Sequence, residues 1–273
     1  MLPLIQLLPF LSTAVMLVFT IFVLQRFAVR RRLNFLFWGI GLAMFGFSSF
    51  AEAYLSLVWS RWVFYGWYLF GAALNAAWIG HGTLYLLVRK PWVHIVTVVL
   101  VLGSIVAAIM MAQAVHNLDV ASFSTAHPVS EQYGAHVLAA GETAPSWAKT
   151  TSKVVNGQTV TVQRGLLPLG SPVRLTTPFF NTYGLLTLVG GAIYSAFLFW
   201  RKRVLPNRVI GNVLIAAGAL SIAFASTLTR LGIGQYLYVG ELIAAVLMFW
   251  GFLAAARPQP EEVAVQERAV AVD

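Results

Sequence analysis

Long apolar segments alternate with short polar segments along most of the chain, and this pattern predicts helices that cross a membrane. About 20 apolar residues are needed to span a bilayer as a helix. Because backbone groups in lipid must be paired within their own segment, apolar runs of this length without alternating polarity are predicted to be helices. The seven predicted spans cover about residues 4–24, 34–57, 62–88, 92–114, 178–200, 207–231 and 235–256.

One polar segment, residues 115–177, is much longer than the other connections. Within it, Asn156 and Gly157 separate two runs rich in β-branched residues. An Asn-Gly pair is typical of a two-residue hairpin turn, because both turn positions require positive φ. We therefore expect a small β-hairpin over one end of a single membrane domain, residues 1–256. The polar remainder, residues 257–273, is predicted to be a disordered cytoplasmic tail.

Lysine and arginine gather in the short connections on one side of the predicted bundle, and this orients the chain. Cytoplasmic loops carry an excess of these residues. The rule predicts an outer N-terminus and an inner C-terminus, so residues 115–177 become an external loop between the fourth and fifth helices. The basic residues on the predicted inner side are Arg26, Arg30, Arg31, Arg32, Arg89, Lys90, Arg201, Lys202, Arg203, Arg208, Arg257 and Arg268.

The composition agrees with an all-α integral membrane protein whose main partner is the lipid bilayer. Of 273 residues, 59% are hydrophobic and only 10% are charged, and the mean hydropathy is +0.78. Soluble domains carry roughly 25% charged residues. The net charge of +9 therefore indicates orientation and head-group contacts, and we expect no nucleic-acid partner. The absence of cysteine excludes disulfides and thiolate metal sites.

Three charged residues fall within or at the ends of predicted spans, at a similar depth near the outer side. Glu52 lies near the outer end of the second span, Arg230 at the outer end of the sixth, and Glu241 early in the seventh. Ionisable groups within a membrane are costly and commonly functional. One interpretation is an outward-facing polar pocket for a small ligand. The other is a structural ion pair between Arg230 and Glu241.

The third span adds polar groups to this candidate site. Asn75 and Tyr85 recur at helical spacing, and His81 lies on the flank of the same face. A buried histidine can relay protons or bind a metal or haem. The simpler interpretation is a hydrogen bond between helices, to a tyrosine or a threonine.

No motif in the sequence points to catalysis or to a bound cofactor. Walker, HExxH, GxSxG and CxxC patterns are missing, and nothing positions a nucleophile beside a base. Three loop histidines have spacings that match no metal motif, so we expect them to be solvated: His116, His127 and His136. We therefore predict a protein that is not an enzyme and that binds no metal or cofactor.

The layout of seven spans with an outer N-terminus resembles microbial rhodopsins, heptahelical receptors and the seven-helix sensor regions of bacterial histidine kinases, in topology alone. Residues 235–256 contain no lysine that could bind retinal, which excludes rhodopsin chemistry. We expect a multi-pass protein of a prokaryotic plasma membrane that acts as a sensor or small-ligand-binding module. The alternatives are a small-solute or proton transporter, and an accessory subunit that binds another membrane protein.

Overall fold

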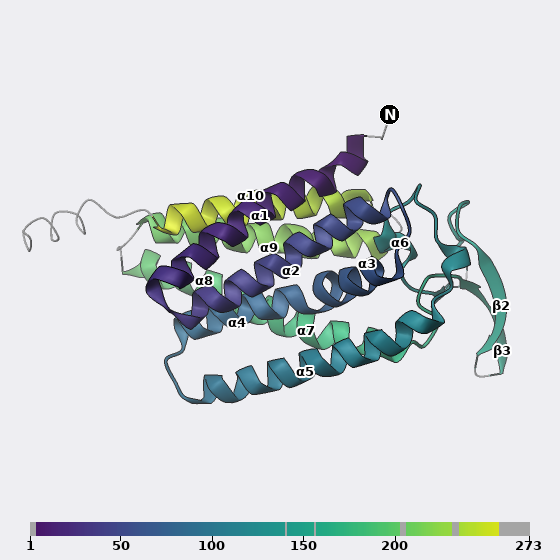
Figure 1. Cartoon of the computed structure of the whole chain (residues 1–273), viewed down its shortest axis with the longest axis horizontal. Helices are drawn as coiled ribbons and strands as arrows, with labels where there is room; N and C mark the ends of the chain where they lie inside the picture. Colours follow the sequence, from purple (N-terminus) through teal and green to yellow (C-terminus); the bar gives the residue numbers. More distant parts are fainter. Residues whose placement is uncertain (1–3, 140, 156, 203–205, 231–234, 257–273) are drawn as a thin grey trace, which may run out of the picture.

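The computed structural model describes residues 4–139, 141–155, 157–202, 206–230 and 235–256, and most of these residues are helical. Long helices lie side by side along the length of the molecule (Figure 1). The unbroken α-helices of this kind are α1 (Leu4–Arg30), α2 (Leu33–Leu55), α5 (Trp92–Ala114), α9 (Pro206–Arg230) and α10 (Gln235–Ala256).

Two further helical stretches change type along their length. Each contains a π-helical segment, η1 or η5, between two α-helical parts. The first stretch consists of α3 (Arg61–Gly66), η1 (Trp67–Leu74) and α4 (Asn75–Leu87). The second consists of η4 (Pro172–Leu175), a 3-10 turn, then α7 (Thr176–Gly184), η5 (Leu185–Gly190) and α8 (Gly191–Arg201).

Within the described residues, six helical segments are long and apolar enough to cross a membrane, which confirms a mostly helical, multi-pass membrane protein. The third predicted span, residues 62–88, is not among the six. Its place is taken by α3, η1 and α4, which are helical throughout but contain Trp, Tyr, Gly, Asn75 and His81. These residues lower its hydropathy, so a seventh span stays a prediction. The six segments are Gln6–Arg30, Leu33–Leu55, Trp92–Asn117, Pro172–Arg201, Pro206–Thr229 and Tyr236–Ala256.

The two interrupted stretches approach each other almost to backbone contact. A Cβ atom on Gly184 would lie 2.5 Å from the carbonyl carbon of Ala76, which only a glycine avoids without a shift. In η1 the Ala72 carbonyl accepts a hydrogen bond from the Asn181 side chain of α7, at 3.1 Å. This close approach fixes α4 against α7 and η5 in the interior of the bundle.

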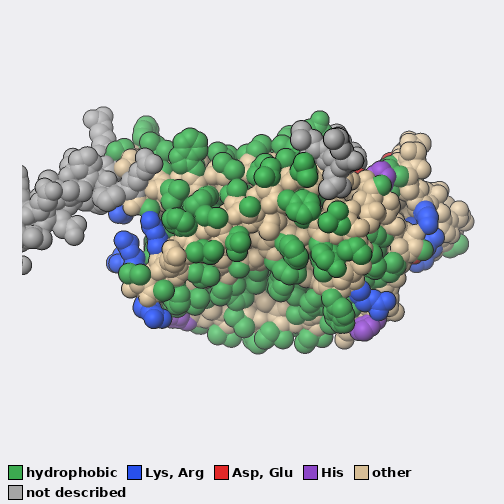
Figure 2. Space-filling view, turned by 45° about the horizontal axis from the view of Figure 1, so that its top comes forward, with side chains coloured by type: hydrophobic (Ala, Val, Ile, Leu, Met, Phe, Trp, Pro, Cys, Tyr) green, Lys and Arg blue, Asp and Glu red, His purple; other side chains and the backbone are tan. Residues whose placement is uncertain are grey.

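The main hydrophobic core joins the first two helices to the last ones. Phe19 of α1 stacks on Phe249 of α10 with ring centroids 5.1 Å apart, and Ala244 and Met248 of α10 are buried in the same cluster. In contrast, α5 lies at the edge of the bundle and keeps much of its apolar surface exposed (Figure 1). Apolar side chains also cover much of the face seen in Figure 2, as expected for a surface in contact with lipid.

A compact segment, residues 115–175, covers one end of the bundle (Figure 1), and we call it the cap. It contains the 3-10 turns η2 (Val115–Asn117) and η3 (Val120–Ser122), and the short helix α6 (Val129–Gln132). The buried amide of Gln132 holds it together. The Gln132 side chain accepts a hydrogen bond from the Ser124 N–H at 2.7 Å and donates to the His127 carbonyl at 2.7 Å.

The cap also carries the predicted hairpin, which is confirmed and extended. Strands β2 (Thr150–Val155) and β3 (Gln158–Gln163) pair antiparallel, and β1 (His136–Val137) adds a third strand on the other side of β3. Gly157 has φ +79°, as the predicted turn requires. Asn156, the other predicted turn residue, lies outside the described residues.

The opposite end of the bundle, which we call the basic end, is where α1, α4 and α8 finish and where α2, α5 and α9 begin. Lysine and arginine side chains gather there, at the left of Figure 2. The predicted orientation, with an inner C-terminus, depends on this gathering of lysine and arginine at one end of the bundle. The predicted tail, residues 257–273, lies outside the described residues.

Candidate functional site

Two glutamates from helices far apart in sequence come together beneath the cap. Glu52 lies in the last turn of α2, and Glu241 lies in the second turn of α10. The two residues are 1% and 4% exposed, and their carboxyl groups are neighbours that act on each other's charge. We call these two residues the carboxyl pair. It is a pair of acidic groups, closed off from solvent.

The surroundings of the carboxyl pair supply few hydrogen-bond donors. The indole Nε1 of Trp67 donates to Oε1 of Glu52 at 2.9 Å. The Ser49 hydroxyl lies beside the Glu241 carboxyl but forms no aligned hydrogen bond to any described group. Oε2 of each glutamate likewise accepts no hydrogen bond from a described N–H or hydroxyl.

These unpartnered oxygens have a direct consequence for the proton content of the site. An ionised carboxylate can only accept hydrogen bonds, whereas a protonated one can also donate. Two carboxylates in contact in a medium of low dielectric repel each other strongly. One proton between Glu52 and Glu241 removes one charge and supplies the missing donor. The geometry therefore favours a carboxyl pair that shares a proton.

Tyr238 connects the carboxyl pair with the cap. It lies one turn before Glu241 on the same face of α10 and is buried. Its hydroxyl contacts the backbone N–H of Val129, the first residue of α6, and lies in the electrostatic field of both glutamates. A change in charge at the pair is therefore felt at a side chain that touches the cap.

Close packing of α9 on α10 holds this part of the site in position. The Ser221 hydroxyl contacts the Gly240 carbonyl at 3.1 Å, next to Glu241 in the chain. A Cβ atom on Gly240 would lie 2.4 Å from the Cβ of Ala225, so a larger residue would force the two helices apart. Gly240 therefore allows the approach that sets the depth and rotation of Glu241.

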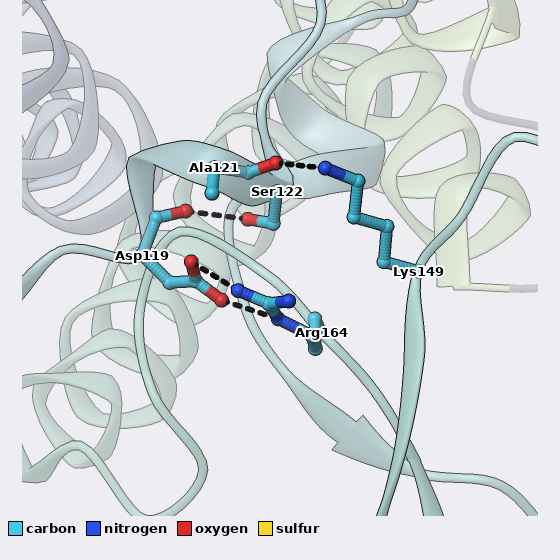
Figure 3. Close-up of polar contacts among 5 residues, drawn as sticks. All are labelled: Asp119, Ala121, Ser122, Lys149 and Arg164. Carbon is cyan, nitrogen blue, oxygen red and sulfur yellow. Dashed lines mark hydrogen bonds and ion pairs between the residues drawn. The ribbon is translucent and has the colours of Figure 1, made fainter.

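The cap itself is held together by polar contacts among its own residues (Figure 3). Arg164 and Asp119 form a bidentate ion pair. Nε of Arg164 lies 2.7 Å from Oδ2 of Asp119, and Nη2 of Arg164 lies 2.6 Å from Oδ1 of Asp119. The hydrogen bonds and charge of Asp119 raise the pKa of the Arg164 guanidinium further above its ordinary value. Lys149 donates to the Ala121 carbonyl at 2.6 Å, on the turn that follows Asp119.

A second buried polar group lies in α4, nearer the basic end. His81 is fully buried; its Nδ1 lies 2.6 Å from the Tyr183 hydroxyl of α7 and its Nε2 lies 2.8 Å from Thr97 Oγ1 of α5. Both ring nitrogens are therefore satisfied between helices. The hydrogen bonds to a tyrosine and a threonine that the simpler interpretation expected for His81 are both present.

The structure separates the predicted site residues into different places. Glu52 and Glu241 meet, whereas His81 belongs to a separate set of contacts on α4, α5 and α7. The Asn75 side chain is buried and accepts the N–H of the next residue, Ala76, so it lies outside the carboxyl pair. The Arg230 side chain, with its predicted ion pair to Glu241, lies outside the described residues.

Several residues around the carboxyl pair were not among the site residues predicted from the sequence. Trp67 and Ser49 complete the surroundings of the carboxyl pair, and Tyr238 links the pair to the cap. The only sequence signal was spacing: Ser49 precedes Glu52 by three residues, and Tyr238 precedes Glu241 by three. That spacing puts each residue on the same helix face as the nearby glutamate.

Metal ligands are not clustered in the described part of the chain. No group of three or more His, Asp or Glu side chains there is arranged to hold a metal ion. In the cap, His127 stacks on Trp147 with ring centroids 4.6 Å apart.

Comparison with known proteins adds no candidate function: no family model, curated protein or solved structure matches the chain.

Proposed function

We propose that this protein is a non-enzymatic sensor or small-ligand-binding module of a prokaryotic plasma membrane, and that the carboxyl pair is its binding site. The observation that carries the proposal is the contact between two buried carboxyl groups whose Oε2 atoms lack a described donor. Such a site favours positive charge. Its ligand is a proton or a small cation, admitted from the side covered by the cap.

Transmission of the binding event follows from the neighbours of the pair. Neutralising the pair removes repulsion between α2 and α10 and alters the field at Tyr238. Tyr238 contacts α6, so the cap is the element that responds. Binding beneath the cap and a readout on its surface suit a module that passes a signal to a partner.

A pH titration of stability tests the binding site. Raising the pH removes the shared proton and leaves two charges in contact, so the thermal stability of the purified protein in lipid nanodiscs should fall as pH rises. In Glu241→Gln an amide replaces the proton-sharing acid, and the fall should be much smaller. Glu142→Gln, the same change on an exposed cap residue, is the control and should behave as the unaltered protein.

The same assay distinguishes a proton from a cation. Sodium, potassium and ammonium chlorides are compared at high pH and constant ionic strength. A rise in melting temperature with one of them, lost in Glu241→Gln, identifies that cation as a ligand. No rise with any salt leaves the proton as the ligand. A pH response that is unchanged in both Glu241→Gln and Glu52→Gln would overturn the proposal.

The proposed topology has seven spans, with an outer N-terminus and an inner C-terminus. Residues 61–87 support a seventh span, because α3 begins beside the cap and α4 ends at the basic end (Figure 1). The stretch is also about 40 Å long at 1.5 Å per residue, enough to cross a bilayer.

The absence of native cysteine makes this topology testable with single cysteines at exposed positions. In intact cells an impermeant maleimide should label Ser152→Cys and should label Lys202→Cys and Arg32→Cys only after permeabilisation. With six spans, Arg32 and Ser152 would lie on the same side, because only two spans would separate them. Labelling of Arg32→Cys together with Ser152→Cys would therefore refute the seventh span.

A small-solute transporter is the less favoured alternative. The half of α10 beyond Glu241 contains no polar side chain, and no hydrogen bond among the described residues links the carboxyl pair to His81. A transporter would require a continuous polar path past the pair.

A further inference from the structure

The contacts of His81 continue as a chain of hydrogen bonds toward the basic end. Thr97 Oγ1 lies 2.8 Å from His81 Nε2 and 2.8 Å from the Tyr85 hydroxyl. The Tyr85 hydroxyl lies 2.9 Å from Nδ1 of His94, an exposed residue in the first turn of α5. The chain therefore leads from a fully buried imidazole to one at the surface, through two hydroxyl groups.

The resting arrangement of hydrogens in this chain can be worked out from its donors and acceptors. The Thr97 hydroxyl donates to the carbonyl of Val93 at 3.0 Å, so it accepts from His81 Nε2–H and from Tyr85. Tyr85 then accepts from Nδ1–H of His94. His81 carries its hydrogen on Nε2 and accepts from Tyr183 at Nδ1. Every group is satisfied, but two donors converge on Thr97 and no proton can pass it.

A change at three groups converts this arrangement into a conducting one. When the Thr97 hydroxyl turns from the Val93 carbonyl toward Tyr85, the Tyr85 hydroxyl turns toward His94, and His94 carries its hydrogen on Nε2, the donors run in one direction: His81 Nε2–H to Thr97, Thr97 to Tyr85, and Tyr85 to the free Nδ1 of His94. A proton leaving Nε2 of a doubly protonated His81 displaces the Thr97 proton to Tyr85, and Tyr85 gives its own proton to His94. Each hydroxyl loses one proton and gains one, His81 returns to neutral with its hydrogen on Nδ1, and His94 becomes charged. The same steps in reverse carry a proton that His94 takes from water to Nε2 of His81.

We infer that Thr97 and Tyr85 form a gated proton path that connects buried His81 with water at the basic end of the bundle. The ligand of this second site is a proton, and the Thr97 hydroxyl is its gate. The inference stands apart from the proposed function, since the path does not include Glu52 or Glu241.

The surroundings of His81 support a path for protons and no larger ligand. From α2, Phe37 packs edge-on against the His81 ring at 4.7 Å and stacks on Tyr85 at 5.1 Å. The titratable groups that face His81 are Tyr85 of α4 and Tyr183 of α7, while α5 supplies the uncharged Thr97. A proton on His81 thus meets hydroxyl groups that can accept or donate, and the aromatic rings exclude bulk water.

The test measures how fast the Nε2–H of His81 exchanges with water. The full-length protein is labelled with ¹⁵N-histidine in nanodiscs, and its His81 signal is assigned as the one missing in His81→Gln. Saturation transfer from water then gives the exchange rate. Tyr85→Phe keeps the ring that stacks on Phe37 but removes the hydroxyl, so exchange should slow about tenfold or more.

Matched variants separate a proton path from general loosening. Tyr65→Phe removes a different tyrosine hydroxyl that donates to α5, at Ala108, and should leave the His81 exchange rate unchanged. Thr97→Val should slow exchange as Tyr85→Phe does, whereas Thr97→Ser retains a hydroxyl and should restore it. If Tyr85→Phe fails to fold, the comparison of Thr97→Val with Thr97→Ser decides. Equal exchange rates in Thr97→Val and Thr97→Ser would overturn the inference.

Discussion

The two buried polar places in this bundle satisfy their hydrogen bonds in opposite ways. Around His81, each ring nitrogen and each hydroxyl has a partner on another helix. At the carboxyl pair, the two neighbouring groups are both acids, and Oε2 of each lacks a described donor. When every polar group has a hydrogen-bond partner, as around His81, the site contributes to the stability of the fold without a ligand. When partners are missing, as at the carboxyl pair, that contribution depends on a bound proton or cation.

The largest effect is expected from removing one member of the carboxyl pair. Glu52→Leu leaves the Trp67 indole without its acceptor and Glu241 without its neighbour, at a cost of about 3 kcal/mol in the free energy of unfolding. Glu52→Gln keeps an acceptor for Trp67 and gains a donor for Glu241, so it should cost much less. Unfolding in mixed micelles measures both. Equal losses would mean that shape, and not hydrogen bonding, determines the role of this position.

A smaller loss is expected at His81, where the contrast with the pair becomes sharper. Tyr183→Phe keeps the ring but leaves His81 Nδ1 without a partner, at a cost of about 1.5 kcal/mol. The stability lost in Tyr183→Phe should change little with pH above neutral, because no repulsion between carboxylates is involved. The stability lost at the carboxyl pair should depend on pH. Unfolding at two pH values gives the comparison; a strong fall in stability at high pH would contradict it.

Loosening the cap should raise hydrogen exchange near the carboxyl pair and leave exchange at His81 unchanged. Asp119→Asn removes the charge that faces Arg164 and that raises the pKa of the Arg164 guanidinium. Exposed ion pairs contribute little, so the change in overall stability should be small. Hydrogen exchange of the α6 backbone, next to Tyr238, should rise, while His81 should keep its rate. Faster exchange at both places would show that the cap and the basic end are coupled.

The smallest effect is expected at Ser49. Its hydroxyl forms no aligned hydrogen bond, so Ser49→Ala should change the free energy of unfolding by no more than about 0.5 kcal/mol. Because the hydroxyl lies beside Glu241, the same variant should still shift the pH at which stability falls. A loss as large as that of Glu52→Leu would show that Ser49 is a required donor to the pair.

The sequence was sufficient to predict features that depend on local pattern. Apolar run length predicted the helices, and the Asn-Gly pair predicted the turn between β2 and β3. Counting residues from the helix ends placed Glu52 and Glu241 at a similar depth, and the structure brings them together.

Rotation of the helices was beyond what local pattern can determine. Depth does not say which way a side chain faces, so the sequence did not single out Glu52 as the neighbour of Glu241. The predicted ion pair with Arg230 stays a prediction, because the Arg230 side chain lies outside the described residues. The partners of His81 come from α5 and α7, and Tyr183 is 102 residues away along the chain. Contacts of that separation depend on how whole helices pack, and no local spacing encodes them.

The π-helical segment η1 lies between Trp67, which contacts the carboxyl pair, and α4, which carries His81. A π segment accommodates one more residue than an α-helical turn would. An extra residue in a purely α-helical stretch would turn everything after it by about 100° relative to everything before it. The wider π turn takes up that residue, so Trp67 and His81 can both face their partners. Deleting one residue within η1 should therefore return the stretch to α-helical geometry with both side chains still in place, whereas deleting one residue of α4 before His81 should turn His81 away from its partners.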